Sequence, residues 1–168
     1  ANYMVESFTP GKYTIEKARI VPTLLSKKVI YNGKAQSLDT DNFGFDLQFI
    51  YKLNGFRVDE CIDAGTYTVQ AEFAGNNNYY PAKSKEATLI IEKQFVFISL
   101  TSCEFIYDGA IKYPEFSYDK NIGIDENAFT FKFENDIFPQ EVGLYNFAII
   151  ISDNNFEGQT QGVVKVQK

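Results

Sequence analysis

Apolar and polar residues alternate in several short segments of the chain. The clearest alternation runs over residues 64–73, where every second position is apolar and Thr, Gln or Glu fills most of the positions between. Because neighbouring side chains of a β-strand point to opposite faces, this pattern predicts a strand with one buried face. The predicted buried face holds Tyr67, Val69, Ala71 and Phe73.

The same alternation recurs over residues 45–53 and 129–133, and residues 145–151 repeat its inward face with Tyr145, Phe147, Ile149 and Ile151. Asn54-Gly55 follows the first of these segments and predicts a two-residue hairpin turn, because both residues tolerate positive φ. Gly, Asn, Asp and Pro interrupt the chain at short intervals, and no apolar pattern with a helical period extends beyond a turn or two. The sequence therefore predicts an all-β chain.

The chain also repeats its own pattern. Tyr31-Asn32-Gly33 returns as Tyr107-Asp108-Gly109, 76 positions later (109 − 33 = 76). Asn-Gly and Asp-Gly predict a tight hairpin turn in each copy. A period of this length indicates two small domains in series, a first β repeat over residues 18–93 and a second over residues 94–168.

The beginning of the chain carries a partial third copy. Asn2-Tyr3 precedes Asn78-Tyr79 by the same 76 positions (78 − 2 = 76). A lone strand must either dock on the repeat that follows or stay extended. Residues 1–17 are therefore predicted to be the tail strands of a preceding repeat or a linker.

Another set of residues recurs at matching positions of the repeats. Asn-aromatic pairs occur at Asn2-Tyr3, Asn78-Tyr79 and Asn155-Phe156, and recurrence favours a structural role over recognition, which usually lies on variable loops. We expect the Asn to adopt a left-handed backbone conformation and the aromatic ring to enter the core, as corner tyrosines do in sandwiches. The residues assigned to the fold are Gly33, Gly65, Tyr67, Asn78, Gly109, Gly143, Tyr145 and Asn155.

Two tyrosines beside this loop are candidates for ligand binding. Tyr79 and Tyr80 could stack on a sugar ring while Asn76-Asn77-Asn78 bonds its hydroxyls. For Tyr79 the structural role is the stronger hypothesis, because its position is aromatic in each repeat. Tyr80 is the exception, because its counterpart in the second repeat is Glu157 and the fold does not require an aromatic ring there.

The second repeat differs from the first on the outward face of one strand. Leu144, Ala148 and Ile150 stand where the first repeat has Thr, Gln and Glu. An apolar outward face indicates that a loop, the neighbouring repeat or a partner covers it. These three residues are a further candidate for binding a glycan or a protein.

Charge and composition remove several classes of function. The chain has a net charge of −6 and no run of Lys or Arg that could neutralise successive phosphates, so nucleic acid is not an expected partner. No segment approaches the roughly 18 apolar residues that span a bilayer, so no membrane insertion by this chain is expected. Histidine is absent, which removes Ser/His and Cys/His nucleophile pairs and histidine-ligated metals.

The acidic residues indicate no reaction centre. The 22 Asp and Glu are scattered along strands and turns, where acidic side chains are mostly solvated. A calcium loop beginning at Asp39 fails because Ile50 stands where a bidentate Glu is needed. We therefore expect no enzyme, no catalytic residue, no metal ligand and no cofactor; calcium between repeats and an internal Lys–Asn isopeptide bond are left open.

The two cysteines do not occupy equivalent positions. Cys103 corresponds to Lys27 of the first repeat and Cys61 has its own place, so a disulfide repeated within each unit is excluded. Free thiols are the favoured interpretation, with one bridge across the joint between repeats left open.

The order of the motifs resembles a known family. After Tyr31-Asn32-Gly33 come Ala64-Gly65-Thr66-Tyr67, then Gly75-Asn76-Asn77-Asn78-Tyr79, then Leu89-Ile90-Ile91-Glu92-Lys93. This order is similar to that of the tandem Ig-like repeats of bacterial cell-surface proteins, of the types called MBG and YDG. The match is weaker in the second repeat, where Val142-Gly143-Leu144-Tyr145 replaces the Ala-Gly-Thr-Tyr motif.

The resemblance implies two small Ig-like β-sandwiches in tandem, with β-grasp-like units as the competing topology. It also implies export to the bacterial cell surface and an extracellular role as spacer, stalk scaffold or adhesin-like array, whose partners are neighbouring repeats of the same parent chain. A monomer is expected. Fold analogy leaves two alternatives open, a module that binds a host glycan or glycoprotein and a non-catalytic module of a carbohydrate-active enzyme.

Overall fold

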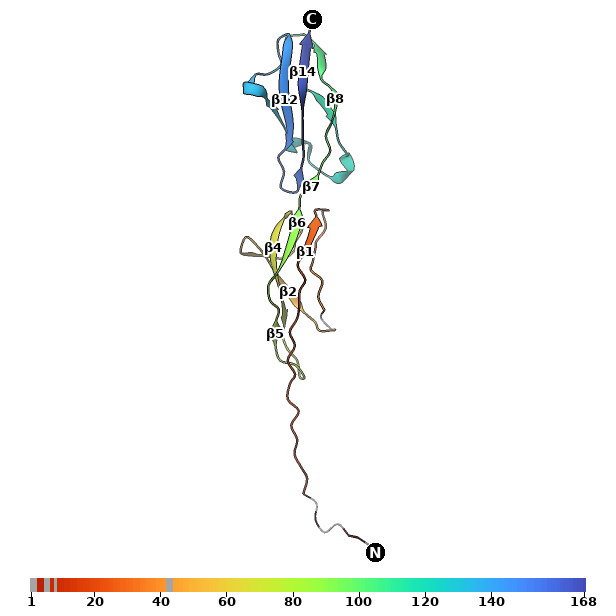
Figure 1. Cartoon of the computed structure of the whole chain (residues 1–168), viewed down its shortest axis with the longest axis vertical. Helices are drawn as coiled ribbons and strands as arrows, with labels where there is room; N and C mark the ends of the chain where they lie inside the picture. The colour runs from red at the N-terminus through yellow and green to blue at the C-terminus, as the bar shows by residue number, and fades with distance from the viewer. Residues whose placement is uncertain (1–2, 5–6, 8, 42–43) are drawn as a thin grey trace.

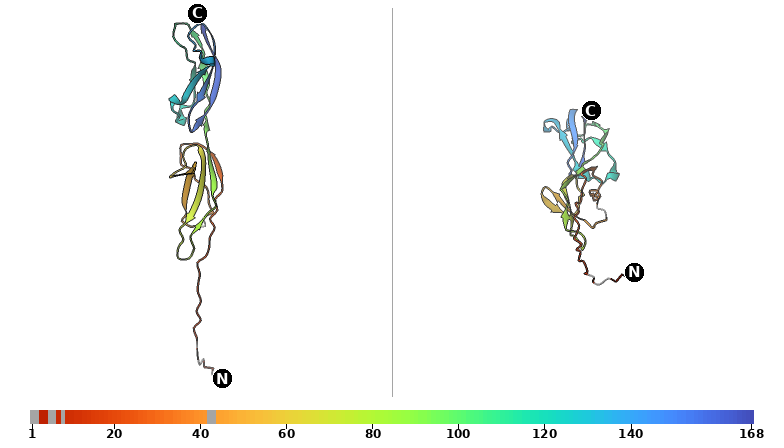
Figure 2. Two further views of the ribbon diagram at one scale, coloured as in Figure 1. Left: turned by 90° about the vertical axis from the view of Figure 1, so that its left-hand side faces the viewer. Right: turned by 60° about the horizontal axis from the view of Figure 1, so that its bottom comes forward.

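The computed structural model describes residues 3–4, 7, 9–41 and 44–168. Two groups of sheets follow one another along the long axis, with the N-terminal segment extending away from the first group and the C-terminus at the far end of the second (Figure 1). We call residues 18–93 the first unit and residues 94–168 the second unit. Figure 2 shows the same end-to-end arrangement from the side.

The first unit is built on one six-stranded sheet. Its strand order is β1-β6-β4-β2-β3, with β5 paired to the end of β4; β1 and β6 are parallel and the other pairs are antiparallel. The strands are β1 (Lys27–Ile30), β2 (Gln48–Leu53), β3 (Phe56–Val58), β4 (Gly65–Phe73), β5 (Ala82–Lys83) and β6 (Ala87–Glu92).

The second unit has a four-stranded sheet of order β11-β12-β14-β9 and two short strand pairs, β10 with β8 and β13 with β7. Its strands are β7 (Gln94–Phe95), β8 (Ser99–Ser102), β9 (Glu104–Ile106), β10 (Glu115–Ser117), β11 (Phe129–Phe133), β12 (Gly143–Ile151), β13 (Phe156–Glu157) and β14 (Gln159–Gln167). The helical elements in the described part are the 3-10 turns η1 (Lys120–Ile122), η2 (Glu126–Ala128) and η3 (Glu134–Asp136).

The two units share one strand arrangement. In each, a short edge strand runs parallel to the last strand, and Lys28 opposite Ile90 in the first unit corresponds to Glu104 opposite Lys165 in the second. The central order of β2-β4-β6 and β11-β12-β14 is that of strands C, F and G in immunoglobulin domains. The fold is therefore all-β and Ig-like. A β-grasp unit packs its sheet on an α-helix, and the described residues form none, so that alternative is wrong.

Each unit has a hydrophobic core of its own. The first core contains Tyr67, Val69 and Leu89, and the second contains Phe147, Ile149 and Val164. The predicted alternation of residues 64–73 is confirmed, because all four of its apolar side chains are buried. One side chain contacts both cores, since Tyr31 packs at the edge of each.

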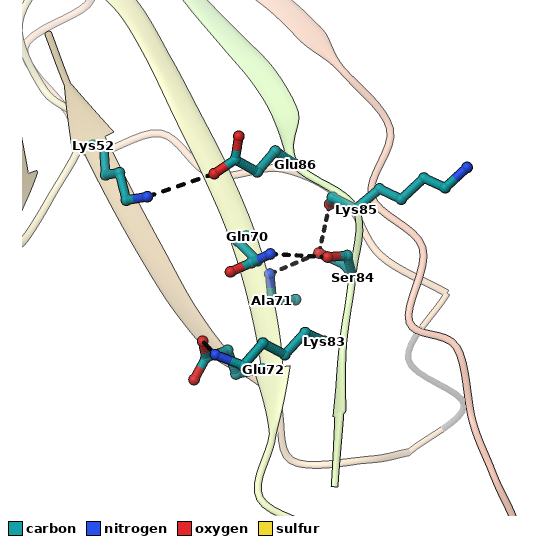
Figure 3. A network of polar contacts seen from close by, with 8 residues as sticks. All are labelled: Lys52, Gln70, Ala71, Glu72, Lys83, Ser84, Lys85 and Glu86. Atoms are coloured by element: carbon teal, nitrogen blue, oxygen red, sulfur yellow. Dashed lines mark hydrogen bonds and ion pairs between the residues drawn. The ribbon is translucent and has the colours of Figure 1, made fainter. Parts of the chain in front are cut away.

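A polar network supplements the strand ladder where β5 leads into β6 (Figure 3). The Ser84 N–H still donates to the Ala71 carbonyl at 2.8 Å, as a ladder bond would. The buried Ser84 hydroxyl accepts a hydrogen bond from the Ala71 N–H at 2.9 Å and donates one to the Lys85 carbonyl at 2.7 Å. The Gln70 amide donates to the Ser84 carbonyl at 3.1 Å. A buried polar group without a partner is costly. These bonds satisfy the polar groups of the buried Ser84, and so stabilise the point at which the chain leaves β5 and turns into β6.

The predicted hairpin turns have different outcomes. Asn54 (φ 52°) and Gly55 (φ 83°) join β2 to β3, with Leu53 opposite Phe56, as predicted. The hairpins at Asn32-Gly33 and Asp108-Gly109 are wrong, although both glycines have positive φ. The strands before them pair in parallel with β6 and β14, so each turn leads the chain away from the sheet.

The described part of the N-terminal segment forms no strand before Ala18. Tyr13 and Ile15, which lie within the segment predicted to hold tail strands or a linker, are exposed. Among the described residues, Ala18 is the first to pair, through a bridge to Tyr79. That this segment completes a preceding repeat stays a prediction.

Candidate functional site

The joint between the two units is formed by a strand that passes directly from one to the other. β6 ends at Glu92 and β7 begins at Gln94, so only Lys93 lies between them. Gln94 N–H donates to the Asn155 carbonyl and Val96 N–H donates to the Glu157 carbonyl, both at 2.8 Å. The connecting segment is therefore part of the second unit's β-structure rather than a free linker.

A tight loop of the second unit lies against this strand. The Asp153 carboxylate accepts hydrogen bonds from the N–H groups of Asn155 (2.7 Å) and Phe156 (3.0 Å). Such a side chain fixes the turn by replacing a backbone acceptor. The loop therefore presents the side chains of Asn155 and Phe156 in a defined direction.

Asn155 bridges to the first unit with both atoms of its amide group. Its Oδ1 accepts from the Ala64 N–H at 2.7 Å, and its Nδ2 donates to Asp63 Oδ1 at 2.9 Å. Two hydrogen bonds to the planar Asn155 amide fix the rotation of that amide as well as its distance from the first unit, much as bidentate pairs do. The Asn155 side chain therefore restricts the orientation of the second unit relative to the first.

The receiving loop of the first unit is held by a buried tyrosine. The Tyr67 hydroxyl donates to the Asp63 carbonyl at 2.8 Å, the arrangement called a tyrosine corner in immunoglobulin folds. Burial, together with the nearby Cys61, raises the pKa of Tyr67, so the hydroxyl stays protonated and remains a donor. The same residue thus fills the core and positions the contact to Asn155.

Apolar and charged contacts complete the joint. The rings of Tyr31 and Phe156 meet edge to face with centroids 5.4 Å apart, and Phe156 is buried. Lys93 Nζ donates to the Asp153 carbonyl at 2.6 Å. An edge-to-face aromatic pair contributes about 1 kcal/mol beyond its buried area, so the joint combines directional and hydrophobic contacts.

The predicted structural residues fall partly into this joint. Gly65 and Tyr67 begin β4 at the receiving loop, and Asn155 makes the bridge. The expected left-handed backbone at Asn78 and Asn155 is wrong, because neither is among the described residues with positive φ. Asn155 instead uses its side-chain amide.

Gly65 and Gly143 have negative φ, so packing rather than backbone freedom limits these positions. A Cβ at Gly65 would lie 3.0 Å from Leu53 Cδ1, and one at Gly143 would lie 3.3 Å from the ring of Tyr145. Gly33 and Gly109 do have positive φ and serve the turns described above.

The two candidate tyrosines occupy different environments. The Tyr79 ring lies 4.9 Å from that of Phe45, which in turn contacts Phe73, so Tyr79 belongs to an aromatic cluster of the fold. Tyr80 is 40% exposed and the guanidinium of Arg19 lies over its ring at 5.1 Å. The structure therefore places only Tyr80 at the surface with a face engaged by a cation.

The candidate face of β12 is less continuous than its sequence indicated. Leu144 is 72% exposed, while Ala148 and Ile150 are half-buried. Their cross-strand neighbours are largely polar: Thr130, Lys132, Gln159, Gln161 and Lys165. The apolar area is thus divided among polar side chains of β11 and β14.

A groove that sequence reasoning missed lies beside β7. It has a volume of about 450 Å³, and its lining includes Phe95, Phe97, Tyr118 and Asp119. Phe95 and Phe97 are 63% and 76% exposed. Their counterparts 76 positions earlier in the first unit are Arg19 and Val21 (95 − 19 = 97 − 21 = 76), so the fold does not require aromatic rings here.

The two thiols lie apart from any cluster of acidic groups among the described residues. Cys61 and Cys103 are both free, as favoured by the sequence, and burial raises the pKa of Cys61 to about 11. Within the described residues, no three His, Cys, Asp or Glu side chains gather as a metal site would need. No helix in that part of the chain combines the length and apolar character needed to cross a membrane.

Comparison with known proteins gives one family match. Residues 21–95 match the family model described as the MBG domain, which covers most of the first unit. No curated protein matches the chain.

Two solved structures of Sidekick-1 immunoglobulin domains are similar to the chain. Domains 1–4 (crystal form 1) align at 14% identity over 89% of this chain and 48% of theirs, with a TM-score of 0.30. Domains 1–5 align at 14% identity over 88% of this chain and 39% of theirs, also at 0.30. The chain spans less than half of either structure, and scores this low transfer no element or site.

Proposed function

We propose that the chain is a structural segment of an extracellular bacterial surface protein, in which two copies of one Ig-like repeat act as a spacer or stalk scaffold. The MBG match supports the repeat assignment for the first unit, and the shared strand order supports it for the second. The role is non-catalytic and monomeric, with neighbouring repeats of the parent chain as partners.

The observation that carries this proposal is the joint. A spacer must keep its length, and so its units must not rotate freely about their connection. Here the connection is one residue long, and Asn155 binds Asp63 and Ala64 across it. Nearest-neighbour packing of this kind makes an array of small units semi-rigid.

Residual dipolar couplings of backbone amides test the proposal. If the joint is rigid, couplings from both units fit one alignment tensor. In Asn155→Ala the two tensors should separate, whereas Asn154→Ala, in the same loop, should leave them equal. Two different tensors in the unaltered chain would contradict a spacer role.

A second candidate function rests on the groove beside β7. Aromatic rings stack on sugar faces, and the side chains of Asp119 and Ser117 in the same groove could bond hydroxyls. This would make the second unit a module that binds a host glycan or glycoprotein, either on a surface protein or beside a carbohydrate-active enzyme.

Glycan-array binding followed by amide shift mapping tests this second function. Phe97→Ala should abolish the binding, while Phe56→Ala, which removes an equally exposed Phe from the first unit, should leave it unchanged. Absence of binding to any glycan would rule the groove out as a sugar site.

A further inference from the structure

The loop that receives Asn155 has a counterpart at the far end of the second unit. The Tyr145 hydroxyl donates to the Glu141 carbonyl at 2.9 Å, as the Tyr67 hydroxyl does to the Asp63 carbonyl. Both tyrosines begin the central strand of their sheet. Glu141 and Val142 therefore take the places that Asp63 and Ala64 have at the joint.

The aromatic partner is present at this far end as well. Tyr107 N–H donates to the Gln167 carbonyl, as Tyr31 N–H donates to the Glu92 carbonyl, each at 2.8 Å. Tyr107 and Val142 are 43% and 48% exposed. Tyr31 and Ala64 are half-buried at the joint, so the far end carries the same groups without their cover.

The inserting half of the joint also occurs twice. The Asn76 side chain accepts from the N–H groups of Asn78 and Tyr79 at 2.9 Å, as Asp153 does in the second unit. Ala18 N–H donates to the Asn78 carbonyl at 2.8 Å, matching Gln94 and Asn155. Asn78 is exposed, and its loop follows the end of β4 that points away from the joint.

We propose that Tyr107, Glu141 and Val142 form a docking surface for the Asn-aromatic loop of another unit of this same kind. The Val142 N–H donates to the Asn amide oxygen, the Asn amide nitrogen donates to the Glu141 carboxylate, and the incoming aromatic ring packs on Tyr107. The joint inside the chain supplies the geometry for each contact. The inference rests on the proposed spacer function and adds to it the residues that select the next unit.

The test extends the full chain after Lys168 with a second copy of residues 18–93, so that the added Asn78 can reach the docking surface. Residual dipolar couplings from the second and the added unit should then fit one alignment tensor. The Val142 amide should exchange with solvent about tenfold more slowly than in the unextended chain, as expected for one new hydrogen bond.

Three variants of the extended chain separate the contact from simple tethering. Asn78→Ala in the added copy and Glu141→Ala should each return the Val142 exchange rate towards its original value. Asn77→Ala in the added copy should not. Glu141 holds Tyr145 through its backbone, so the Ala variant keeps the tyrosine corner.

The outcomes distinguish this inference from the proposed function. An added unit with its own alignment tensor, beside a joint at Asn155 that stays rigid, overturns the docking surface and leaves the spacer proposal in place. An added unit held rigidly but insensitive to Asn78→Ala overturns the docking surface as well. Independent tensors for the first and second units overturn both.

Discussion

Asn155 and Asp63 lie 92 positions apart in the chain, yet Nδ2 of the first donates to Oδ1 of the second over 2.9 Å. The two residues belong to units with separate cores. Their bond therefore contributes little to either core and instead selects one orientation between them. This separation of roles makes the joint accessible to mutation without loss of the fold.

A double-mutant cycle should measure that bond. We expect Asp63→Ala and Asn155→Ala to couple by about 1 kcal/mol in the free energy of unfolding, because the hydrogen bond exists only when both side chains are present. Urea denaturation of the two single variants and the double variant gives the value. Asn154→Ala paired with Asp63→Ala should show additive effects; strict additivity in both cycles would contradict the contact.

The two tyrosine corners should respond differently to loss of the hydroxyl. Tyr67→Phe and Tyr145→Phe should each cost about 1 kcal/mol of stability through one lost hydrogen bond. Only Tyr67→Phe should also loosen the joint, because only Asp63 contacts the other unit. Urea denaturation and residual dipolar couplings check the two parts. Equal effects of both variants on the alignment tensors would sink this assignment.

Core substitutions should destabilise one unit at a time. Ile149→Ala, in the second core, should cost about 2–5 kcal/mol and lower the unfolding midpoint of the second unit. Amide signals of the first core, such as that of Val69, should keep their midpoint. Leu144→Ala, on the same strand but exposed, should change stability by less than about 0.5 kcal/mol. Loss of both cores together would show that they fold as one.

The pKa of the Cys61 thiol, raised by burial to about 11, predicts slow labelling. At pH 8 the folded protein should react with a disulfide reagent mainly at Cys103, which is only half-buried, and at least about tenfold more slowly at Cys61. In urea the two rates should converge. In the control variant Cys103→Ala, only the slow labelling of Cys61 should remain. Rapid labelling of Cys61 in that variant would contradict its burial.

Asp108 should titrate below its ordinary range. The Lys112 ammonium bonds its carboxylate, which lowers the pKa of Asp108, and the Ala110 N–H adds to the effect. Because the pKa of Asp108 is lower in the folded than in the unfolded state, the stabilisation from this pair is fully present above the unfolded pKa. It is lost as pH falls through the folded pKa. Carboxyl NMR titration should show a midpoint below 3.8 that rises in Lys112→Ala; an unchanged midpoint would contradict the pair.

The strands were predictable because each buries one face within its own unit. Residues 64–73 and 129–133 carry that alternation, and β4 and β11 match it closely. Edge pairing could not be predicted in this way, since Lys27–Ile30 joins β6 in parallel through backbone groups that any sequence supplies. The hairpins predicted at Asn32-Gly33 and Asp108-Gly109 are therefore wrong, although Gly33 and Gly109 do adopt the positive φ that such dipeptides indicate.

The joint was only partly visible in the sequence. Recurrence of the Asn-aromatic pair indicated that Asn155 has a structural role. The same recurrence is expected whether the Asn adopts a special backbone conformation or bonds the neighbouring unit, so the pattern could not distinguish the two. The sequence does hold one further signal: an acidic residue stands two positions before the Gly that begins each of these strands, Asp63 before Gly65 and Glu141 before Gly143. The groove had a signal too, because Phe95 and Phe97 replace Arg19 and Val21 at equivalent positions.

The parallel pairing of β1 with β6 and of β9 with β14 determines how the chain would carry tension. A pull along the long axis draws the two strands of each of these parallel pairs in opposite senses, and so loads all the hydrogen bonds between them in shear. Rupture then requires several hydrogen bonds to break together instead of one after another. Under increasing tension, a string of such units would unfold in discrete steps, one unit at a time. Its length would stay nearly constant between one step and the next.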